Sequence, residues 1–233
     1  MNVVSVDLDD TLIATKIQYE EAKNWFGDYV SNNFNVEYAD AVDEYTDQSS
    51  NLIDEFGLSK HRFPKAAVVA LESLVDNPSE EEKRRAYEIG RSAFKSRDQY
   101  MKKGFIEDGA EEFLETVTDT SDHSVLVTAG DQDIQNRKID ALNLREYFDQ
   151  IEVVGMNGKT EILEGFDDAD TLVHIGNSNH SDVKAASNVN ADCIYIPRGE
   201  WIDSNNEYEG SGRIYTVESI SEAEEVLRSI LGN

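Results

Sequence analysis

The chain has 233 residues, of which 48 are Asp or Glu and 21 are Lys or Arg, so its formal net charge at pH 7 is −27. Nucleic acid and anionic membrane surfaces would repel so negative a chain, and both are excluded as partners. A single cysteine, Cys193 in the apolar run "CIYIP", excludes an internal disulfide and a cysteine-based metal cluster. Without a signal-peptide pattern or a membrane-length apolar run, we expect a cytoplasmic monomer or homodimer.

The excess of acidic residues suits a cell interior with very high salt, because concentrated salt screens the mutual repulsion of surface carboxylates. We therefore predict a halophilic protein. Its free energy of unfolding, measured with urea, is expected to be larger in molar KCl than in dilute buffer. Equal stability in the two solutions would contradict this interpretation.

The first predicted element is a buried strand over residues 2–8, "NVVSVDL", which is rich in β-branched apolar residues. Three carboxylates, Asp7, Asp9 and Asp10, lie at its end. We expect Asp10 to be a solvated loop residue or the N-terminal cap of a helix. The other two need a chemical reason, because carboxylates about 4 Å apart repel by ~4 kcal/mol at an effective dielectric near 20.

Residues 15–104 have a helical pattern throughout, in the stretches 19–30, 40–56, 63–75 and 79–94. The last stretch begins with a capping box, Ser79 and Glu82. A crossover between strands does not need so long a connection, so we predict an all-helical cap domain over 15–104. Aromatic residues at roughly helical spacing are expected in its core: Tyr19, Trp25, Phe26 and Tyr29.

From residue 105 onward, short apolar runs alternate with amphipathic helical stretches. Strands are predicted at 123–130, 150–155, 171–177 and 192–197, with a weaker sixth at 213–219. This alternation is typical of an α/β fold with a parallel sheet. We predict that 1–14 and 105–233 form a Rossmann-like, doubly wound parallel sheet core into which the helical cap is inserted.

Polar residues follow the predicted strands, and ligands bind beyond the carboxyl ends of strands in an open parallel sheet. These residues are therefore expected to meet in one crevice. They are Asp7, Asp9, Thr128, Lys159, Asn177, Ser178 and Asp182.

The motifs resemble those of the haloacid dehalogenase-like (HAD) superfamily, whose phosphohydrolases use an aspartate nucleophile. The first motif, Asp-x-Asp-x-Thr-Leu after an apolar strand, is present at 7–12, and the second, a strand ending in Thr or Ser, at Thr128. The third, a lysine before a helix, is Lys159. The fourth, Gly-Asp-Ser-x-x-x-Asp, is present at 176–182 with Asn177 in place of the first aspartate. The resemblance covers the whole core and is to members with a helical cap after the first motif.

The resemblance implies a Mg²⁺-dependent phosphatase of small phosphorylated metabolites, such as sugar phosphates or nucleoside monophosphates. Asp7 would be the nucleophile that forms an aspartyl-phosphate, and Asp9 the general acid and base. The phosphate-binding residues would be Thr128, Ala129 and Lys159. The metal ligands would be Asp7, Asp9 through its backbone carbonyl, Asn177 and Asp182.

Asp9 separates the chain from the dehalogenating branch of the superfamily, which lacks an acid two residues after the nucleophile. Asn177 offers a neutral oxygen that still coordinates a metal, so a weaker Mg²⁺ affinity is expected. Two alternatives stay open. One is a phosphotransferase of the β-phosphoglucomutase kind, and the other is a catalytically weak module that binds a phosphorylated ligand.

Three further features of the sequence are weaker indications of function: the basic stretch 83–103, His174 and His180. Residues 83–103 hold eight basic residues and two acidic ones. We expect them to pair with acidic neighbours or, alternatively, to attract an anionic substrate. His174 is expected to be structural, and His180 to be exposed or to lie near the metal loop without binding a metal.

Overall fold

The computed structural model describes residues 1–103, 105–198 and 210–232. The chain forms two compact units, one made of Met1–Lys16 with Arg97–Asn233 and the other of Ile17–Ser96. The helical insert is therefore shorter at its end than the predicted 15–104. Helix α6 (Arg97–Lys103) belongs to the first unit, where Tyr100 packs against Phe105 and Ala141.

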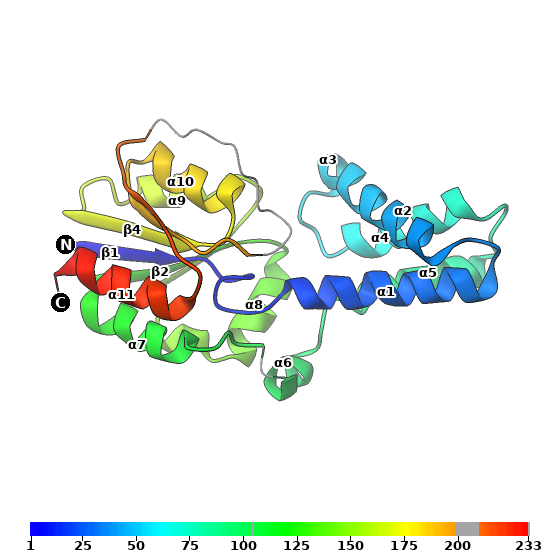
Figure 1. Ribbon diagram of the computed structural model, residues 1–233, viewed down its shortest axis with the longest axis horizontal. Coiled ribbons are helices and arrows are strands. Elements are labelled where there is room, and N and C mark those ends of the chain that lie inside the picture. The colour runs from blue at the N-terminus through cyan, green and yellow to red at the C-terminus, as the bar shows by residue number, and fades with distance from the viewer. Residues whose placement is uncertain (104, 199–209, 233) are drawn as a thin grey trace. The chain divides into compact units, whose positions relative to one another are not determined.

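In the described residues, six parallel strands form one sheet in the order β3-β2-β1-β4-β5-β6 (Figure 1). Every strand predicted from the sequence is present, the weaker sixth included, and the α/β class is confirmed. The strands are β1 (Asn2–Val6), β2 (His123–Ala129), β3 (Gln150–Val154), β4 (Thr171–Gly176), β5 (Asp192–Tyr195) and β6 (Ile214–Thr216). The chain reverses its order along the sheet at β1, which lies between β2 and β4. Ligands of open parallel sheets bind at such a point.

Helices cover both faces of the sheet, because strands buried on both sides present apolar side chains in both directions. One face carries α7 (Ala110–Thr120), α8 (Gln132–Ala141) and α11 (Ile220–Leu231), and the other α9 (Lys159–Glu164) and α10 (Lys184–Asn188) (Figure 1). Val4 and Val6 of β1 belong to the core with α7 and α11, whereas Val3 packs with Ile162 of α9. Cys193 is buried in β5, as expected of a small apolar residue.

The second unit is made of helices around an apolar core of its own. They are α1 (Lys16–Asn33), α2 (Tyr38–Asn51), α3 (Ile53–Phe56), α4 (Arg62–Leu74) and α5 (Glu80–Arg91). The predicted capping box is confirmed at the start of α5. The Ser79 hydroxyl accepts a hydrogen bond from the Glu82 N–H, and the Glu82 carboxylate accepts one from the Ser79 N–H.

The aromatic prediction for this unit is right in three positions and wrong in one. Phe26 is fully buried, and Tyr19 and Tyr29 pack against the same core. Trp25 is 48% exposed, with the Lys95 ammonium 5.4 Å from the centre of its ring. A cation over an indole ring stabilises an aromatic side chain that apolar neighbours do not cover.

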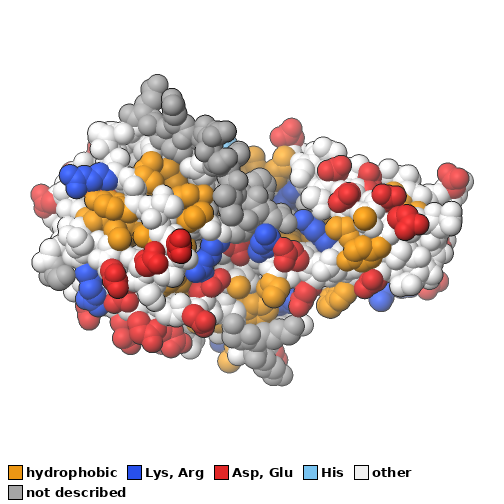
Figure 2. All heavy atoms as spheres, viewed as in Figure 1, with side chains coloured by type: hydrophobic (Ala, Val, Ile, Leu, Met, Phe, Trp, Pro, Cys, Tyr) orange, Lys and Arg blue, Asp and Glu red, His pale blue; other side chains and the backbone are white. Residues whose placement is uncertain are grey.

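Four of the eight basic residues in 83–103 pair with acidic neighbours in the described structure. Ion pairs join Lys83 to Glu72 and Glu80, Arg84 to Glu81, Arg91 to Glu88 and Lys95 to Glu21. The side chains of Lys102 and Lys103 lie outside the described residues. Figure 2 shows acidic side chains over the surface of both units. No helix in the described part of the chain is long and apolar enough to cross a membrane.

Candidate active site

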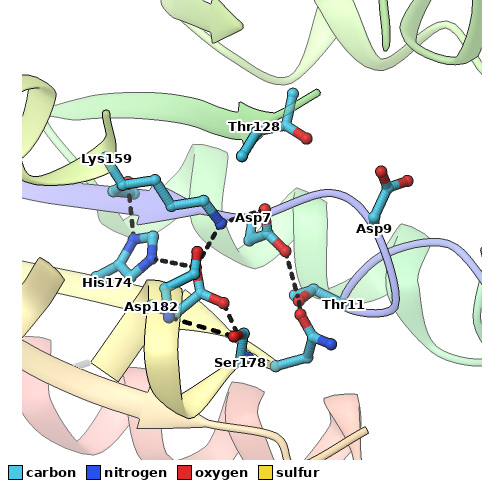
Figure 3. Close-up of polar contacts among 12 residues, drawn as sticks. Asp7, Asp9, Thr11, Thr128, Lys159, His174, Ser178 and Asp182 are labelled. Carbon is cyan, nitrogen blue, oxygen red and sulfur yellow. Dashed lines mark hydrogen bonds and ion pairs between the residues drawn. The ribbon is translucent and has the colours of Figure 1, made fainter. Parts of the chain in front are cut away.

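The polar residues predicted to share a crevice lie at the carboxyl ends of β1, β2 and β4 and at the start of α9 (Figure 3). The Asp7 N–H donates to the carbonyl of Ile175, 2.9 Å away, so the β1–β4 pairing continues as far as Asp7. Thr128 is the penultimate residue of β2 and is buried. Lys159 is the first residue of α9 and is also buried.

Lys159 lies between two buried carboxylates. Its Nζ is 2.5 Å from Oδ1 of Asp7 and also donates to Oδ1 of Asp182. Asp182 belongs to a turn of π-helix (Asn179–Val183) that follows β4. Gly176 makes this approach possible, because a Cβ there would lie 2.2 Å from Cγ of Asp182. One lysine thus neutralises one of two adjacent negative charges and leaves a net negative charge in the site.

The pKa values of the two carboxylates move in opposite directions. Burial raises the pKa of Asp7 to about 7, and the nearby Asp182 charge adds to this effect while Lys159 opposes it. Burial also acts on Asp182, but Lys159 and His174 hold its pKa well below the usual range. Burial lowers the pKa of Lys159, but Asp182 and Asp7 outweigh it and leave this pKa above its ordinary value. Asp182 is therefore the permanent counter-ion of Lys159.

Asp182 has a further set of buried partners. His174 in β4 contacts its Oδ1 through Nε2 at 3.0 Å, and the Ser178 N–H donates to its Oδ2 at 2.9 Å. The other ring nitrogen of His174 contacts the Ser5 hydroxyl at 3.0 Å. Burial lowers the pKa of His174, so the neutral imidazole donates from Nε2 and accepts from Ser5. His174 is structural, as expected, and its structural role is to hold Asp182.

The amide oxygen of Asn177 and the carboxylate of Asp7 both contact the Thr11 hydroxyl. Its Nδ2 donates to the backbone carbonyl of Arg198 at 2.9 Å, which assigns the other amide atom as the oxygen. The Thr11 hydroxyl lies 3.2 Å from Oδ2 of Asp7 and 3.4 Å from Oδ1 of Asn177. Two hard oxygen atoms therefore converge beside one buried hydroxyl.

The side chain of Asp9 is held apart from this cluster by partners that sequence reasoning missed. Lys138 donates to both carboxylate oxygens, at 2.7 and 2.9 Å, Gln135 to Oδ2 at 2.9 Å, and Thr15 to Oδ1 at 2.6 Å. Burial raises the pKa of Asp9, but the adjacent Lys138 ammonium outweighs it and leaves this pKa below its usual value. Gln135 also donates to Oγ1 of Thr128 at 2.6 Å.

Asp10 has a purely local role, and the expectation of a helix cap is confirmed. It adopts a left-handed backbone conformation, with φ of 55°. Its Oδ1 accepts from the N–H groups of Thr15 and Lys16, 2.8 and 2.7 Å away, at the start of α1. Helix N-termini carry such unpaired N–H groups, and an aspartate satisfies two of them here.

A cavity of about 270 Å³ opens beside Lys159. Ala129 also lines it, and His180 and Lys184, both exposed, contribute nitrogen atoms. The remaining lining residues are Asn157, Thr160, Ser181, Ala185 and Asn188. Its described lining contains no carboxylate, which in a chain with 48 acidic residues makes it a favourable place for an anion.

The donors available for a metal are oxygens, and few of them are free carboxylates. In the described residues, no three His, Cys, Asp or Glu side chains are grouped to hold a metal ion. Asp7 Oδ2 and Asn177 Oδ1 lie on the same side of the site, both in contact with the Thr11 hydroxyl. The carboxylates of Asp9 and Asp182 form ion pairs with Lys138 and Lys159. Such a set fits Mg²⁺, which binds through one or two carboxylates and keeps several waters.

No sequence-family model and no curated protein sequence matches the chain, whereas solved structures match its fold. A haloacid dehalogenase-like family hydrolase from Xanthomonas campestris is 22% identical with a TM-score of 0.75, covering 100% of this chain and 96% of that one. The magnesium-bound HAD-hydrolase YfnB from Bacillus subtilis is 15% identical with a TM-score of 0.65, covering 100% and 99%. The 2-haloacid dehalogenase from Pseudomonas syringae pv. Tomato DC3000 is 19% identical with a TM-score of 0.59, covering 99% of each. The chain has the HAD-like hydrolase fold, with a helical segment inserted between β1 and β2.

Proposed function

We propose that the protein is a Mg²⁺-dependent phosphatase of small phosphorylated metabolites that works through an aspartyl-phosphate on Asp7. The observation that carries this proposal is the pair of carboxylates at the end of β1. Asp7 is bound to Lys159, which also binds Asp182, and Asp9 is bound to Lys138, so the two carboxylates of β1 are paired with different cations. A nucleophile and a separate acid–base group are the two carboxylates that phosphoryl transfer through an acyl phosphate requires.

The chemistry takes two displacements at phosphorus. In the first, an Asp7 oxygen bonds to phosphorus, the bond to the ester oxygen breaks, and Asp9 gives that oxygen a proton; Asp9 must enter this step in its protonated form, which the second step regenerates. In the second, water attacks phosphorus, the bond to Asp7 breaks, and Asp9, as the carboxylate that Lys138 favours, takes the proton of the water. The Thr128 hydroxyl and the Lys159 ammonium bind the phosphoryl oxygens, where negative charge gathers in both transition states.

Asp7, Asn177 and the backbone carbonyl of Asp9 are the groups that would hold Mg²⁺. Bound there, the ion supplies positive charge to the phosphoryl oxygens and offsets the net negative charge of the site. Asp182 would not bind the ion directly, since its oxygens already accept hydrogen bonds from Lys159, His174 and the Ser178 N–H. It would contribute its negative charge nearby.

The fold is also that of a dehalogenase, so the choice of reaction depends on the residues. Halide is a leaving group that needs no proton, and a dehalogenase has no use for an acid beside its nucleophile. Phosphate esters of alcohols do need one. Asp9 accepts four hydrogen bonds from Lys138, Gln135 and Thr15. Burying this ion pair costs desolvation free energy, which is hard to explain in a site that does not use the carboxylate.

The test is release of inorganic phosphate from a panel of sugar phosphates, nucleoside monophosphates and p-nitrophenyl phosphate, in molar KCl with millimolar Mg²⁺. Chloride release from 2-chloropropionate is measured in parallel. Phosphate release from the sugar phosphates or nucleoside monophosphates that is lost in Asp9→Asn supports the proposal, whereas p-nitrophenyl phosphate, whose leaving group needs no proton, should keep a residual rate. Chloride release without phosphate release would replace it by dehalogenation. Phosphate release only with a bisphosphate activator would indicate a phosphotransferase, and ligand binding without turnover a binding module.

Asn177→Asp tests the departure from the fourth motif. The new carboxylate cannot donate to the Arg198 carbonyl, and it adds a negative charge beside Thr11, which also contacts Asp7. We expect roughly tenfold tighter Mg²⁺ activation from the added charge, and a metal-free protein less stable by about 1–3 kcal/mol from the lost donor. A Mg²⁺ titration of the rate and urea unfolding in a chelator measure the two effects. Asn143→Asp, an exposed site, is the control, and unchanged Mg²⁺ dependence of Asn177→Asp would refute a role of Asn177 as a ligand.

Lys184 tests whether the cavity beside Lys159 binds an anionic part of the substrate. Lys184→Glu is expected to raise the KM of doubly anionic substrates, such as bisphosphates, by roughly three- to tenfold with little change in kcat. Arg213→Glu makes the same charge change before β6, at the amino-terminal edge of the sheet, and should leave KM unchanged. Equal effects of the two variants would mean that only the total charge matters.

A further inference from the structure

One buried face of α8 carries two polar residues among apolar ones. Ile134, Gln135, Lys138 and Ile139 are all buried, and Lys138 is only 2% exposed. Lysine is almost never buried so fully without a partner, because an ammonium group without solvent needs a counter-charge and hydrogen-bond acceptors. Its partner is the Asp9 carboxylate. We call Gln135 and Lys138 the α8 pair.

The α8 pair and Thr15 bind the Asp9 carboxylate with donors alone. Oδ1 accepts from Lys138 and Thr15, and Oδ2 from Lys138 and Gln135, at 2.6 to 2.9 Å. Each carboxylate oxygen thus has two donors, which leaves the carboxylate one orientation. A group that exchanges protons with a substrate needs such a defined position, since proton transfer depends on the direction of its oxygen atoms.

Gln135 connects Asp9 to the phosphate-binding hydroxyl. Its amide nitrogen has two hydrogens, and its two short contacts are with Oδ2 of Asp9 and Oγ1 of Thr128. Because Thr128 Oγ1 accepts from Gln135, its own hydrogen is left to donate elsewhere. Among the described residues this hydrogen has no acceptor, so it is available to a phosphoryl oxygen.

The backbone is shaped to admit this glutamine. A Cβ at Gly130 would lie 2.9 Å from both Cγ and Cδ of Gln135. Atoms of that kind do not approach so closely, so any side chain at 130 would displace Gln135 from Thr128. The absence of a side chain at Gly130 and the burial of Gln135 belong to one arrangement.

We propose that Gln135 and Lys138 are positioning residues of the reaction, Lys138 acting through Asp9 and Gln135 through both Asp9 and Thr128. This proposal rests on the proposed function. It adds that one face of α8 aligns the proton-transfer group with the phosphate-binding hydroxyl. Neither residue touches the substrate. Replacing either residue should lower the rate only because Asp9 or Thr128 is then displaced from its position.

The first experiment changes the direction of the Gln135 hydrogen bonds. Gln135→Glu keeps the shape but makes the side chain an acceptor, so the Thr128 hydroxyl donates to it instead of to phosphate. Gln135→Met removes the donor without adding charge. We expect kcat/KM to fall about 10- to 100-fold in both, as for other supporting residues. Gln132→Glu, exposed on the same helix, is the matched control and should behave as wild type.

Inorganic phosphate is the probe that separates positioning from mere structure. Its binding, followed calorimetrically, needs no turnover and depends on the Thr128 hydroxyl. We expect weaker binding to Gln135→Glu and Gln135→Met than to wild type or Gln132→Glu, at unchanged far-UV circular dichroism. Wild-type phosphate binding by folded Gln135→Met overturns the role of Gln135. This result is independent of whether the wild type hydrolyses any ester.

The second experiment is a double-mutant cycle on the buried ion pair. Lys138→Met alone should lower kcat by about 10- to 100-fold. In an Asp9→Asn background, the same change should have no further effect on the residual rate with p-nitrophenyl phosphate, because Lys138 acts only through Asp9. The double variant lacks both buried charges and is expected to fold. Additive rate losses would overturn the role of Lys138 while leaving the phosphatase proposal intact.

Discussion

Asp7→Asn is expected to abolish phosphate release and, at the same time, to make the metal-free protein more stable. The amide cannot attack phosphorus, so the loss of rate should reach ~10⁴-fold or more, the scale seen when a covalent nucleophile is removed. The gain in stability comes from the buried cluster. Asp7 and Asp182 share the single Lys159 cation, and Asp7→Asn leaves one neutral ion pair in place of a net negative charge.

The stability effect has a definite pH dependence. The folded-state pKa of Asp7 is raised from 3.8 to about 7. A raised carboxyl pKa means that the folded protein binds the proton more tightly than the unfolded chain, so its stability falls as pH rises from about 4 to about 7. Wild type should lose up to roughly 4 kcal/mol over this range from this group, and Asp7→Asn should not.

Urea unfolding in molar KCl with a chelator, from pH 4 to pH 8, measures this difference. The two proteins should be equally stable near pH 4 and diverge toward pH 7. Mg²⁺ should stabilise the wild type and so reduce the difference in unfolding free energy between the wild type and Asp7→Asn. Asp10→Asn is the control, since an asparagine oxygen still accepts from the N–H groups of Thr15 and Lys16. A variant at Asp7 that is less stable than wild type at neutral pH would contradict this view of the site.

The sequence was sufficient for the sheet because its strands are buried on both faces. Runs such as 2–8 and 171–177 are largely apolar, with Ser5 and His174 as buried polar residues within them, and a parallel sheet gives them one common edge. The convergence of Asp7, Lys159, Asn177 and Asp182 follows from that edge alone. The distance along the chain between them is irrelevant once the strand order is set.

The partners of Asp9 escaped the sequence analysis for a physical reason. In "DIQNRKIDAL", Gln135 and Lys138 are polar residues on a helix, and such residues are usually exposed. Their spacing was informative, because they stand next to Ile134 and Ile139 on the face that packs against the sheet. A lysine and a glutamine on the buried face of a helix require acceptors, and Asp9 and Thr128 provide them.

The end of the helical insert and the exposure of Trp25 were missed because local pattern does not report packing. Helix α6 has the same helical pattern as the insert, yet Tyr100 finds its apolar partners at Phe105 and Ala141 in the first unit. Trp25 is at helical spacing from Tyr29, yet its ring is half exposed and has the Lys95 ammonium over it. Tertiary contacts, which sequence periodicity does not encode, decide both outcomes.

Lys159→Met is expected to have the largest effect on stability, and Asp182→Asn should reverse most of it. The single variant leaves Asp7 and Asp182 buried side by side without their shared cation. Breaking a buried pair in this way costs ~3–5 kcal/mol, because an uncompensated charge stays in a medium of low polarity. In the double variant Lys159→Met/Asp182→Asn the second charge is gone, and stability should recover to within about 1–2 kcal/mol of wild type.

Turnover should not recover with stability, and this contrast separates the two roles of the lysine. The double variant folds but has no ammonium group for the phosphoryl oxygens, so its kcat should stay at least ~10²-fold below wild type. Urea unfolding in molar KCl and phosphate release from the best substrate of the panel are the two measurements. If Lys159→Met were as stable as wild type, the charge sharing among Asp7, Lys159 and Asp182 would not govern the site. If the double variant regained full activity, Lys159 would serve the fold alone.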